Sequence, residues 1–227
     1  LSLSSELMEL NVNLIGVGAG LSYDVSGPTH HCIEDIIIMR ALPNFITISP
    51  SDSKITESLV DYTIDVKKPK YIRLDAKPVT QIYDKTDDFN LEIGFCELIN
   101  GEKVCIVATG FMTHKALNAA KRLQEDNINV GVLDMIILKP VNEELLSDSL
   151  NNYEYIITIE EGFINKGGLD SLILNVINKY QLDIRLKNLG FDDKYVFGLG
   201  GRDHLHKINN LDEESIIEIA KEYISGS

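Results

Sequence analysis

The sequence predicts an α/β protein made of two consecutive three-layer domains, each with a mostly parallel sheet. Short, β-branched apolar runs alternate along the chain with segments whose apolar residues have helical spacing. A polar stretch at residues 75–90, with a proline and a charged run, interrupts this alternation once. Glycines, a proline and two histidines follow the first apolar run, where an open parallel sheet presents loops at its carboxyl edge.

The first domain is predicted over residues 1–78. Its first strand, Asn11–Val17, ends in a continuous apolar run and is therefore expected to be buried on both faces. After a glycine-rich loop, a helix is expected from His30 to Leu42, because Pro43 cannot continue it. The other elements predicted here are a strand at residues 44–49, a helix at residues 50–66 with Ser51 as its N-cap, and a strand at Lys70–Leu74.

Residues 79–92 are predicted to be a linker, with room for one short strand at Gln81–Tyr83. The second domain is predicted over residues 93–227, where strands and helices alternate again. Its expected strands are residues 104–108, 130–137, 155–159 and 184–189, and its expected helices are residues 114–126, 143–150, 169–180 and 212–223.

Composition and charge exclude several classes of protein. The net charge is −14 and is dispersed along the chain, which argues against a nucleic-acid partner. No apolar run reaches the ~18 residues that a membrane span needs, so no membrane partner is expected. Three cysteines without a CxxC pair are typical of reduced thiols and predict a cytoplasmic protein. Cys32 lies beside the histidines; a core cysteine is favoured there over a reactive thiol.

Two glycine-containing segments of the first loop are candidate sites. Gly16–Gly20 has its third glycine too early for a nucleotide-binding signature, and it predicts a sharp turn or a close approach of the backbone. His30 and His31 follow Gly27-Pro28-Thr29 at a predicted helix start, where backbone N–H groups favour anions. An imidazole there can donate to a substrate oxygen or move a proton. No metal is expected, because adjacent histidines point apart and no third ligand is evident.

The other titratable candidates lie in the second domain. His204 and His206 suit a solvated loop better than a two-ligand site. Glu160 and Glu161 follow a strand, where a general base is plausible in position, but the sequence identifies no partner residue.

At this point the motifs resemble a known family. The segment GVGAGLSYDVSGPTHHCIEDIIIMRALPNFITISPSDSKI is similar to the pyrimidine-binding domain of the transketolase family of thiamine diphosphate enzymes. Further along, CIVATGFMTHKALNAAKRL, IILKPVN, IEEG and GGL resemble the transketolase C-terminal domain in order and spacing.

The resemblance implies a catalytic role for His30, which matches a histidine that contacts donor-sugar hydroxyls and assists proton transfer. Ser26 takes the place of an aspartate that reads a donor hydroxyl, and Gly18 roughly takes the place of a further histidine. Both differences imply an altered donor.

His31, Arg73 and Lys77 complete the substrate-binding set that the resemblance implies. The family's phosphate-binding arginine falls at Ala76 or Lys77, and a lysine offers no bidentate fork for a phosphate.

The resemblance also implies that parts of the site lie outside this chain. The family's catalytic glutamate lies upstream of the first strand, and Glu6 and Glu9 are not in its sequence context. The Gly-Asp-Gly magnesium motif of the diphosphate-binding domain does not occur, so the cofactor-binding residues stay unassigned. Thiamine diphosphate and Mg²⁺ are therefore expected to be held mainly by an upstream domain or subunit, within a homo-oligomeric assembly such as a dimer.

The implied function is transfer of a two-carbon ketol unit between sugars or sugar phosphates, with the chain inactive alone. Two alternatives remain open. One is chemistry like that of 1-deoxyxylulose-5-phosphate synthase, with pyruvate as donor. The other is a non-catalytic assembly or docking role, like that of the equivalent domain of the pyruvate dehydrogenase beta subunit.

Overall fold

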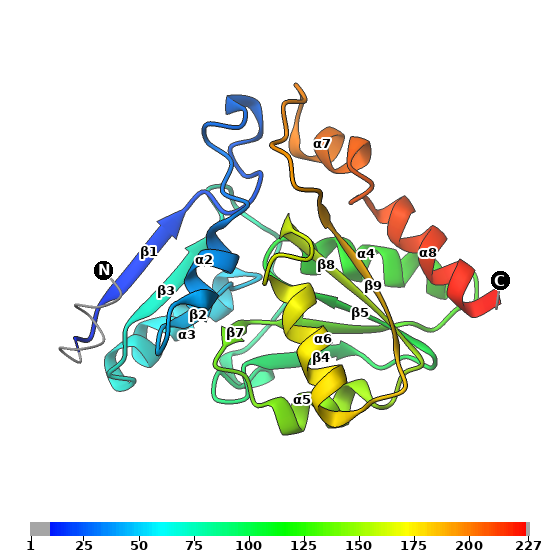
Figure 1. The fold of residues 1–227 in the computed structure, drawn as a ribbon, viewed down its shortest axis with the longest axis horizontal. Helices are drawn as coiled ribbons and strands as arrows, with labels where there is room; N and C mark the ends of the chain where they lie inside the picture. Colours follow the sequence, from blue (N-terminus) through cyan, green and yellow to red (C-terminus); the bar gives the residue numbers. More distant parts are fainter. Residues whose placement is uncertain (1–9, 226–227) are drawn as a thin grey trace.

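The structure is a computed structural model that describes residues 10–225, the side chain of residue 87 excepted. Two α/β units lie side by side, with β1 at one end of the molecule and α8 at the other (Figure 1). The elements are β1 (Asn13–Val17), η1 (Asp24–Ser26), α2 (Asp35–Ala41), β2 (Ile46–Ile48), α3 (Ser53–Asp65), β3 (Lys70–Leu74), η2 (Thr86–Asp88), β4 (Phe95–Ile99), β5 (Val104–Ala108), α4 (Met112–Glu125), β6 (Gly131–Met135), β7 (Ile137–Lys139), α5 (Glu143–Leu150), β8 (Tyr155–Phe163), α6 (Leu169–Tyr180), β9 (Arg185–Phe191), α7 (Arg202–Ile208) and α8 (Glu213–Ser225).

The first sheet has the strand order β1-β3-β2-β7. The strands β1, β3 and β2 are parallel, as predicted, and their carboxyl ends therefore meet at one edge. Helix α3 packs on one face through Ile55 and Leu59, and α2 packs on the other through Met39. The fourth strand, β7, comes from the second unit and pairs antiparallel with β2. The two units thus share a sheet.

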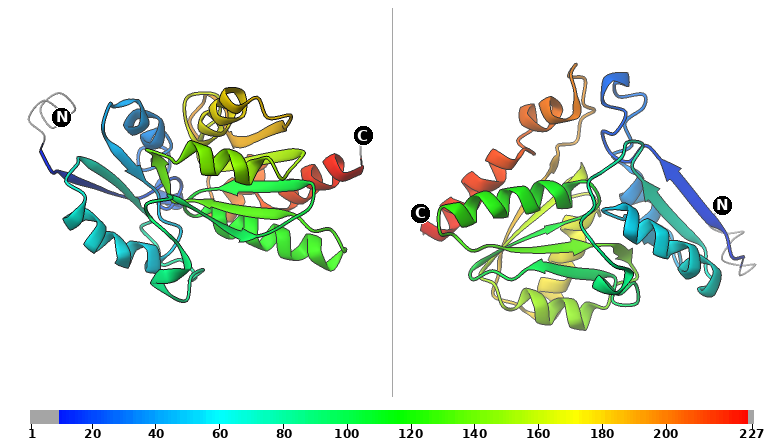
Figure 2. Two further views of the ribbon diagram at one scale, coloured as in Figure 1. Left: turned by 90° about the horizontal axis from the view of Figure 1, so that it is seen from below. Right: turned by 180° about the vertical axis from the view of Figure 1, so that it is seen from behind.

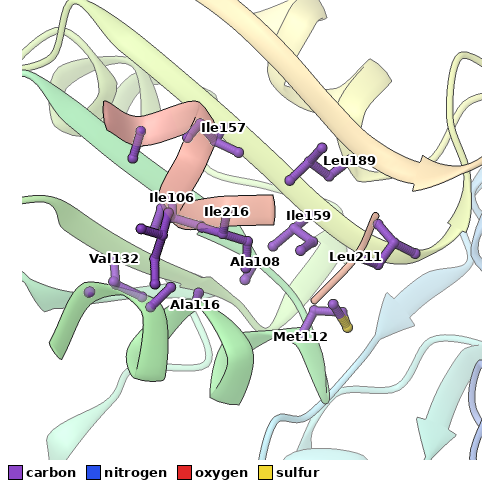
Figure 3. Close-up of a cluster of buried hydrophobic side chains, with 14 of the residues drawn as sticks. Ile106, Ala108, Met112, Ala116, Val132, Ile157, Ile159, Leu189, Leu211 and Ile216 are labelled. Carbon is purple, nitrogen blue, oxygen red and sulfur yellow. The ribbon is translucent and has the colours of Figure 1, made fainter. Parts of the chain in front are cut away.

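The second sheet has the order β4-β6-β5-β8-β9 and is parallel except for β4. Helices α4 and α8 cover one face, and α5 and α6 cover the other (Figure 2). The larger core cluster lies under α4 and α8, where Ile106 and Ile159 of the sheet meet Met112 and Ile216 (Figure 3). The predicted three-layer α/β architecture is therefore confirmed.

The prediction that the first strand is buried on both faces is wrong. The side chains of β1 alternate between exposed and partly buried, and Ile15 and Val17 are 57% and 59% exposed. The physical reason is that β1 pairs only with β3 and forms an edge of the sheet in the described part of the chain. A continuous apolar run does not distinguish an edge strand from a central one.

Two local predictions in this part of the chain also need correction. The N-cap of α3 is Asp52, whose side chain accepts from Ile55 N at 3.0 Å; the Ser51 hydroxyl donates instead to Asp134. No strand forms at Gln81–Tyr83, because the backbone N–H groups of Ile82 and Tyr83 donate to the Asp52 carboxylate at 2.8 and 2.9 Å. The buried Tyr83 hydroxyl donates to Asp134 at 2.9 Å. The hydroxyl groups of Ser51 and Tyr83 thus both bond to the buried Asp134 carboxylate, a partner that the local sequence does not indicate.

The single strand predicted at residues 130–137 is divided into β6 and β7, which belong to different sheets. Strand β4 and helix α7 were not predicted at all. The domain boundaries at residues 78 and 93 remain a prediction. Among residues 10–225, no helix has the length and apolar character required to cross a bilayer.

Candidate functional site

The His30 loop, residues 20–32, follows β1 at the carboxyl edge of the first sheet. Its base is closed by Gly20 and Cys32, which exchange two backbone hydrogen bonds of 2.9 Å each. Gly20 has φ of 55°, and a Cβ added there would lie 2.1 Å from Oε2 of Glu161. Only glycine fits this space. The sharp turn and close backbone approach predicted for the glycine run are therefore present, and the neighbour is the second unit.

His30 and Ser26 are exposed on this loop. The Nδ1 atom of His30 lies 3.0 Å from Oγ1 of Thr29, and its ring packs edge-on against Tyr23, with the ring centroids 6.3 Å apart. The Tyr23 ring also covers Gly18, where an added Cβ would lie 2.5 Å from the ring. A larger residue at position 18 would displace Tyr23 from His30.

The predicted helix start at the two histidines is wrong. Helix α2 begins at Asp35, because the Cys32 N–H bonds back to Gly20 O and holds the chain in an irregular turn. The described backbone therefore provides no helix N-terminus for an anion beside His30. His31 lies within the same turn, with Nε2 3.5 Å from the carbonyl oxygen of Asp24.

Arg73 lies beneath the loop and is only 3% exposed. Its Nε donates to Asp35 at 2.8 Å, and its Nη2 donates to the carbonyls of Cys32 at 3.1 Å and Glu161 at 3.0 Å. Burial opposes its charge, but Asp35 and Glu161 raise the pKa of Arg73 above its ordinary value. The guanidinium therefore binds the loop base to the second unit.

Lys77 lies at the edge of the site and is half-exposed. Its Nζ is 2.8 Å from Oδ1 of Asp24, a buried carboxylate of the His30 loop. Of the five residues proposed from the sequence, His30, Ser26, His31 and Lys77 are therefore on or against this loop, and Arg73 is below it.

A buried charged cluster, which we call the clamp, joins this loop to the second unit. Arg202 donates to both carboxylate oxygens of Glu161, at 2.8 and 2.5 Å, and to Asp75 at 2.6 Å. His206 Nε2 lies 2.6 Å from Glu161, and the backbone N–H of Arg202 donates to Asp24 at 2.8 Å. Burial raises the pKa of Glu161, but Arg202 outweighs it and holds that pKa below its ordinary value.

Sequence reasoning did not find the clamp. The prediction of a solvated loop is wrong for both histidines, because both lie in helix α7. His206 is fully buried there, whereas His204 is exposed. One signal was available: Arg202 and His206 are four residues apart and therefore share one face of a helix. Nothing in the sequence connects that face to Glu161.

Glu160 is a residue of β8 beside the clamp, and its buried side chain reaches the N-terminus of α6. Its Oε1 accepts from the backbone N–H groups of Leu169 at 2.7 Å and Asp170 at 3.4 Å. Burial, with a smaller contribution from Asp170, raises the pKa of Glu160 to about 7. This carboxyl group takes up a proton near neutral pH.

Substitution Glu160→Gln is expected to change the pH dependence of stability. The ordinary pKa is 4.5 and the folded value is about 7, so the stabilising contribution is complete below the ordinary value and is lost as pH rises through the folded value. As the pH rises from about 5 to about 8, the wild type loses this contribution and the variant does not. The free energy of unfolding of the variant, relative to that of the wild type, should therefore increase by on the order of 1–3 kcal/mol. Urea unfolding at both pH values measures this. If the free energies of unfolding of the variant and the wild type differ by the same amount at both pH values, the raised pKa of Glu160 is contradicted.

The cysteines and the side chains that could bind a metal ion are the remaining candidates for chemistry. All three cysteines are free, and burial raises the pKa of Cys32 to about 11, which disfavours a reactive thiolate. Within the described ranges, no three imidazole, thiolate or carboxylate side chains are grouped so that they could hold a metal ion.

Comparison with known proteins adds to this geometry. Residues 1–80 match the family profile described as the transketolase pyrimidine binding domain, and residues 97–216 match the transketolase C-terminal domain. The chain belongs to the transketolase family. The resemblance stated from the motifs is therefore confirmed. Transketolases depend on thiamine diphosphate.

Individual transketolase relatives match nearly the whole chain. It is 34% identical over 210 residues to a putative transketolase C-terminal section of Methanocaldococcus jannaschii, covering 92% of this chain and 65% of the relative. It is also 34% identical to one of the subunits of the apulose-4-phosphate transketolase of Actinobacillus succinogenes, covering 92% of this chain and 67% of that relative. The chain thus spans about two thirds of the length of these two relatives.

A solved structure described as a split gene transketolase, inactive beta4 tetramer, superposes with a TM-score of 0.83 at 33% identity. It aligns with 95% of this chain, which covers 68% of that one. The 1-deoxy-D-xylulose-5-phosphate synthase of Aquifex aeolicus is 32% identical over 92% of this chain, which covers 33% of that enzyme.

Proposed function

We propose that this chain supplies the substrate side of a transketolase-like active site that transfers a two-carbon ketol unit between sugars or sugar phosphates. The observation that carries the proposal is the exposed imidazole of His30, presented by a fixed loop at the carboxyl edge of a pyrimidine-binding domain. At this place an imidazole can donate to a donor-sugar hydroxyl and move a proton.

Donor recognition is proposed to depend on residues around His30. Ser26 can donate to or accept from a substrate hydroxyl, and Lys77 offers a cation to a phosphate, although Asp24 competes for it. Tyr23 covers the position that the family gives to a second histidine, Gly18 in this chain. In this proposal an aromatic surface faces the donor at the place where the resemblance implies an imidazole in other members of the family.

Thiamine diphosphate and Mg²⁺ do not fit the residues of this chain alone. The described residues bring together no metal-ligand set, and the sequence contains no Gly-Asp-Gly motif. When bound, the cofactor supplies carbanion stabilisation. We therefore assign the diphosphate and the metal ion to a separate domain or polypeptide, because one relative is itself only one of the subunits of a transketolase. An oligomeric assembly is proposed on similar ground, because another relative is described as a tetramer.

Isothermal titration calorimetry of this chain with thiamine diphosphate and Mg²⁺ tests the assignment. No saturable binding is expected in the micromolar range, because the groups that neutralise the diphosphate are assigned here to another domain or polypeptide. Addition of a diphosphate-binding subunit should restore binding. Micromolar binding by the chain alone would show that its own residues hold the cofactor.

Pyruvate-dependent chemistry is a second candidate, favoured by the similarity to 1-deoxy-D-xylulose-5-phosphate synthase over 92% of the chain. The products distinguish the two. With the assembled enzyme, ketose phosphate donors should yield a shortened aldose phosphate, whereas consumption of pyruvate with release of CO₂ would support the second candidate.

A further inference from the structure

The His30 loop is held at two places by residues of the second unit. One place is the loop base, and the other is the 3₁₀ turn η1 near the tip, where helix α7 lies close to the loop (Figure 1). Arg73 and Lys77 of the first unit also bond to the loop, but at η1 the contact with the second unit joins residues 178 positions apart, Asp24 and Arg202.

At the tip, the buried carboxylate of Asp24 connects the loop to α7. Its Oδ2 accepts the backbone N–H of Arg202 at 2.8 Å, and its Oδ1 accepts from Lys77 at 2.8 Å and from Val25 N at 2.9 Å. Burial raises the pKa of Asp24, but these hydrogen bonds outweigh it and lower that pKa. An ionised, nearly buried carboxylate with three donors has one favourable position.

Arg202, which provides the N–H, is itself fixed. Its guanidinium contacts Glu161 and Asp75, and its Cζ lies 3.6 Å from the centroid of the Phe111 ring. The side chain is 7% exposed. Movement of the first turn of α7 would therefore break a buried bidentate ion pair, and such pairs hold their geometry strictly.

At the base, Glu161 and Arg73 fix the other end of the loop. The Glu161 side chain lies against the Cα of Gly20, and Arg73 bonds the carbonyls of both Cys32 and Glu161. Glu161 therefore contacts the loop base directly and reaches its tip through Arg202.

We propose that Arg202 is a positioning residue, which sets the place of His30 by holding Asp24 through its backbone N–H while its side chain is locked on Glu161 and Asp75. The effect on the loop conformation depends only on contacts within this chain. The consequence for catalysis rests on the proposed function, because small displacements of an acid–base group reduce turnover steeply.

The sharpest variant is Asp24→Ala, because it removes the bond to Arg202 N–H, together with those from Lys77 and Val25, and leaves the Arg202–Glu161 pair intact. In the full chain, hydrogen–deuterium exchange of the amides at residues 21–31 is expected to accelerate about tenfold or more, the loss expected when charge-assisted hydrogen bonds are removed. The His30 imidazole resonance, assigned with His30→Gln, should also shift as its contact with Tyr23 is lost.

Asp203→Ala is the matched control. It removes the same side chain from the adjacent position of α7, where Asp203 is 84% exposed and pairs with Lys115. Exchange at residues 21–31 and the His30 resonance should be unchanged in this variant. If Asp24→Ala does not fold, Asp24→Asn keeps the shape and should produce a smaller acceleration in the same residues.

Equal exchange of the loop in the Asp24 variants and in Asp203→Ala would overturn the proposal, and so would an acceleration spread evenly over the whole chain. In the assembled enzyme, Asp24→Ala should lower kcat more than it raises KM. A loosened loop together with full turnover by His30→Ala would leave the positioning of the loop intact and refute the proposed function instead.

Discussion

Substitution Arg202→Met is expected to lower the free energy of unfolding by about 3–5 kcal/mol, the usual result when one partner of a buried ion pair is removed. Glu161 is 1% exposed and would keep only His206 as a partner for its side chain among the contacts described above. Its charge would then be buried without the guanidinium that compensates it. Since domains are stable by only about 5–15 kcal/mol, the loss would be a large part of the total.

Urea unfolding followed by circular dichroism measures this effect. Arg122→Met is the matched control, because Arg122 pairs with Glu214 at 2.7 Å while both side chains are 44–60% exposed. Its expected cost is about 0–1 kcal/mol. The double variant Arg202→Met/Glu161→Gln should recover much of the loss, since it removes both charges. A cost for Arg202→Met no larger than that of Arg122→Met would mean that the buried pair contributes nothing to stability.

Much of the fold could be predicted because its signals are local. The ranges of β3, β5, α5 and α6 agree with their predictions, since each has a clear apolar period and a clear boundary. Helix α7 could not be predicted in this way. Two of its buried residues, Arg202 and His206, are polar. They can be buried because their side chains bond to the Glu161 carboxylate. Local pattern contains no information on such a partner.

The same distinction between local and distant signals applies to the candidate site. The motif around His30 is contiguous, so the sequence could identify it and its loop. The residues that fix the loop are far apart: Asp24 and Arg202 are separated by 178 positions, and Glu161 and Arg202 by 41. The resemblance implied that Arg73 binds substrate, but only the packing reveals that its donors point to Asp35 and to backbone carbonyls.

The second large effect is expected at His30 itself. His30→Ala should lower turnover of the assembled enzyme by about 100-fold or more, the size of a lost acid–base contribution. Stability should change little, because His30 is exposed and its described contacts are with neighbouring Thr29 and Tyr23. A role in assembly alone predicts the opposite pattern: unchanged turnover with weakened association of subunits.

The measurement that bears most directly on the proposed role of this chain is therefore steady-state turnover of the assembled enzyme with His30→Ala, beside His204→Ala. His204 is an exposed histidine of α7 and provides the control for loss of an imidazole. We predict that kcat falls about 100-fold or more for His30→Ala and stays unchanged for His204→Ala. Equal, near-wild-type turnover of both variants, with the complex fully assembled, would contradict a catalytic role for His30.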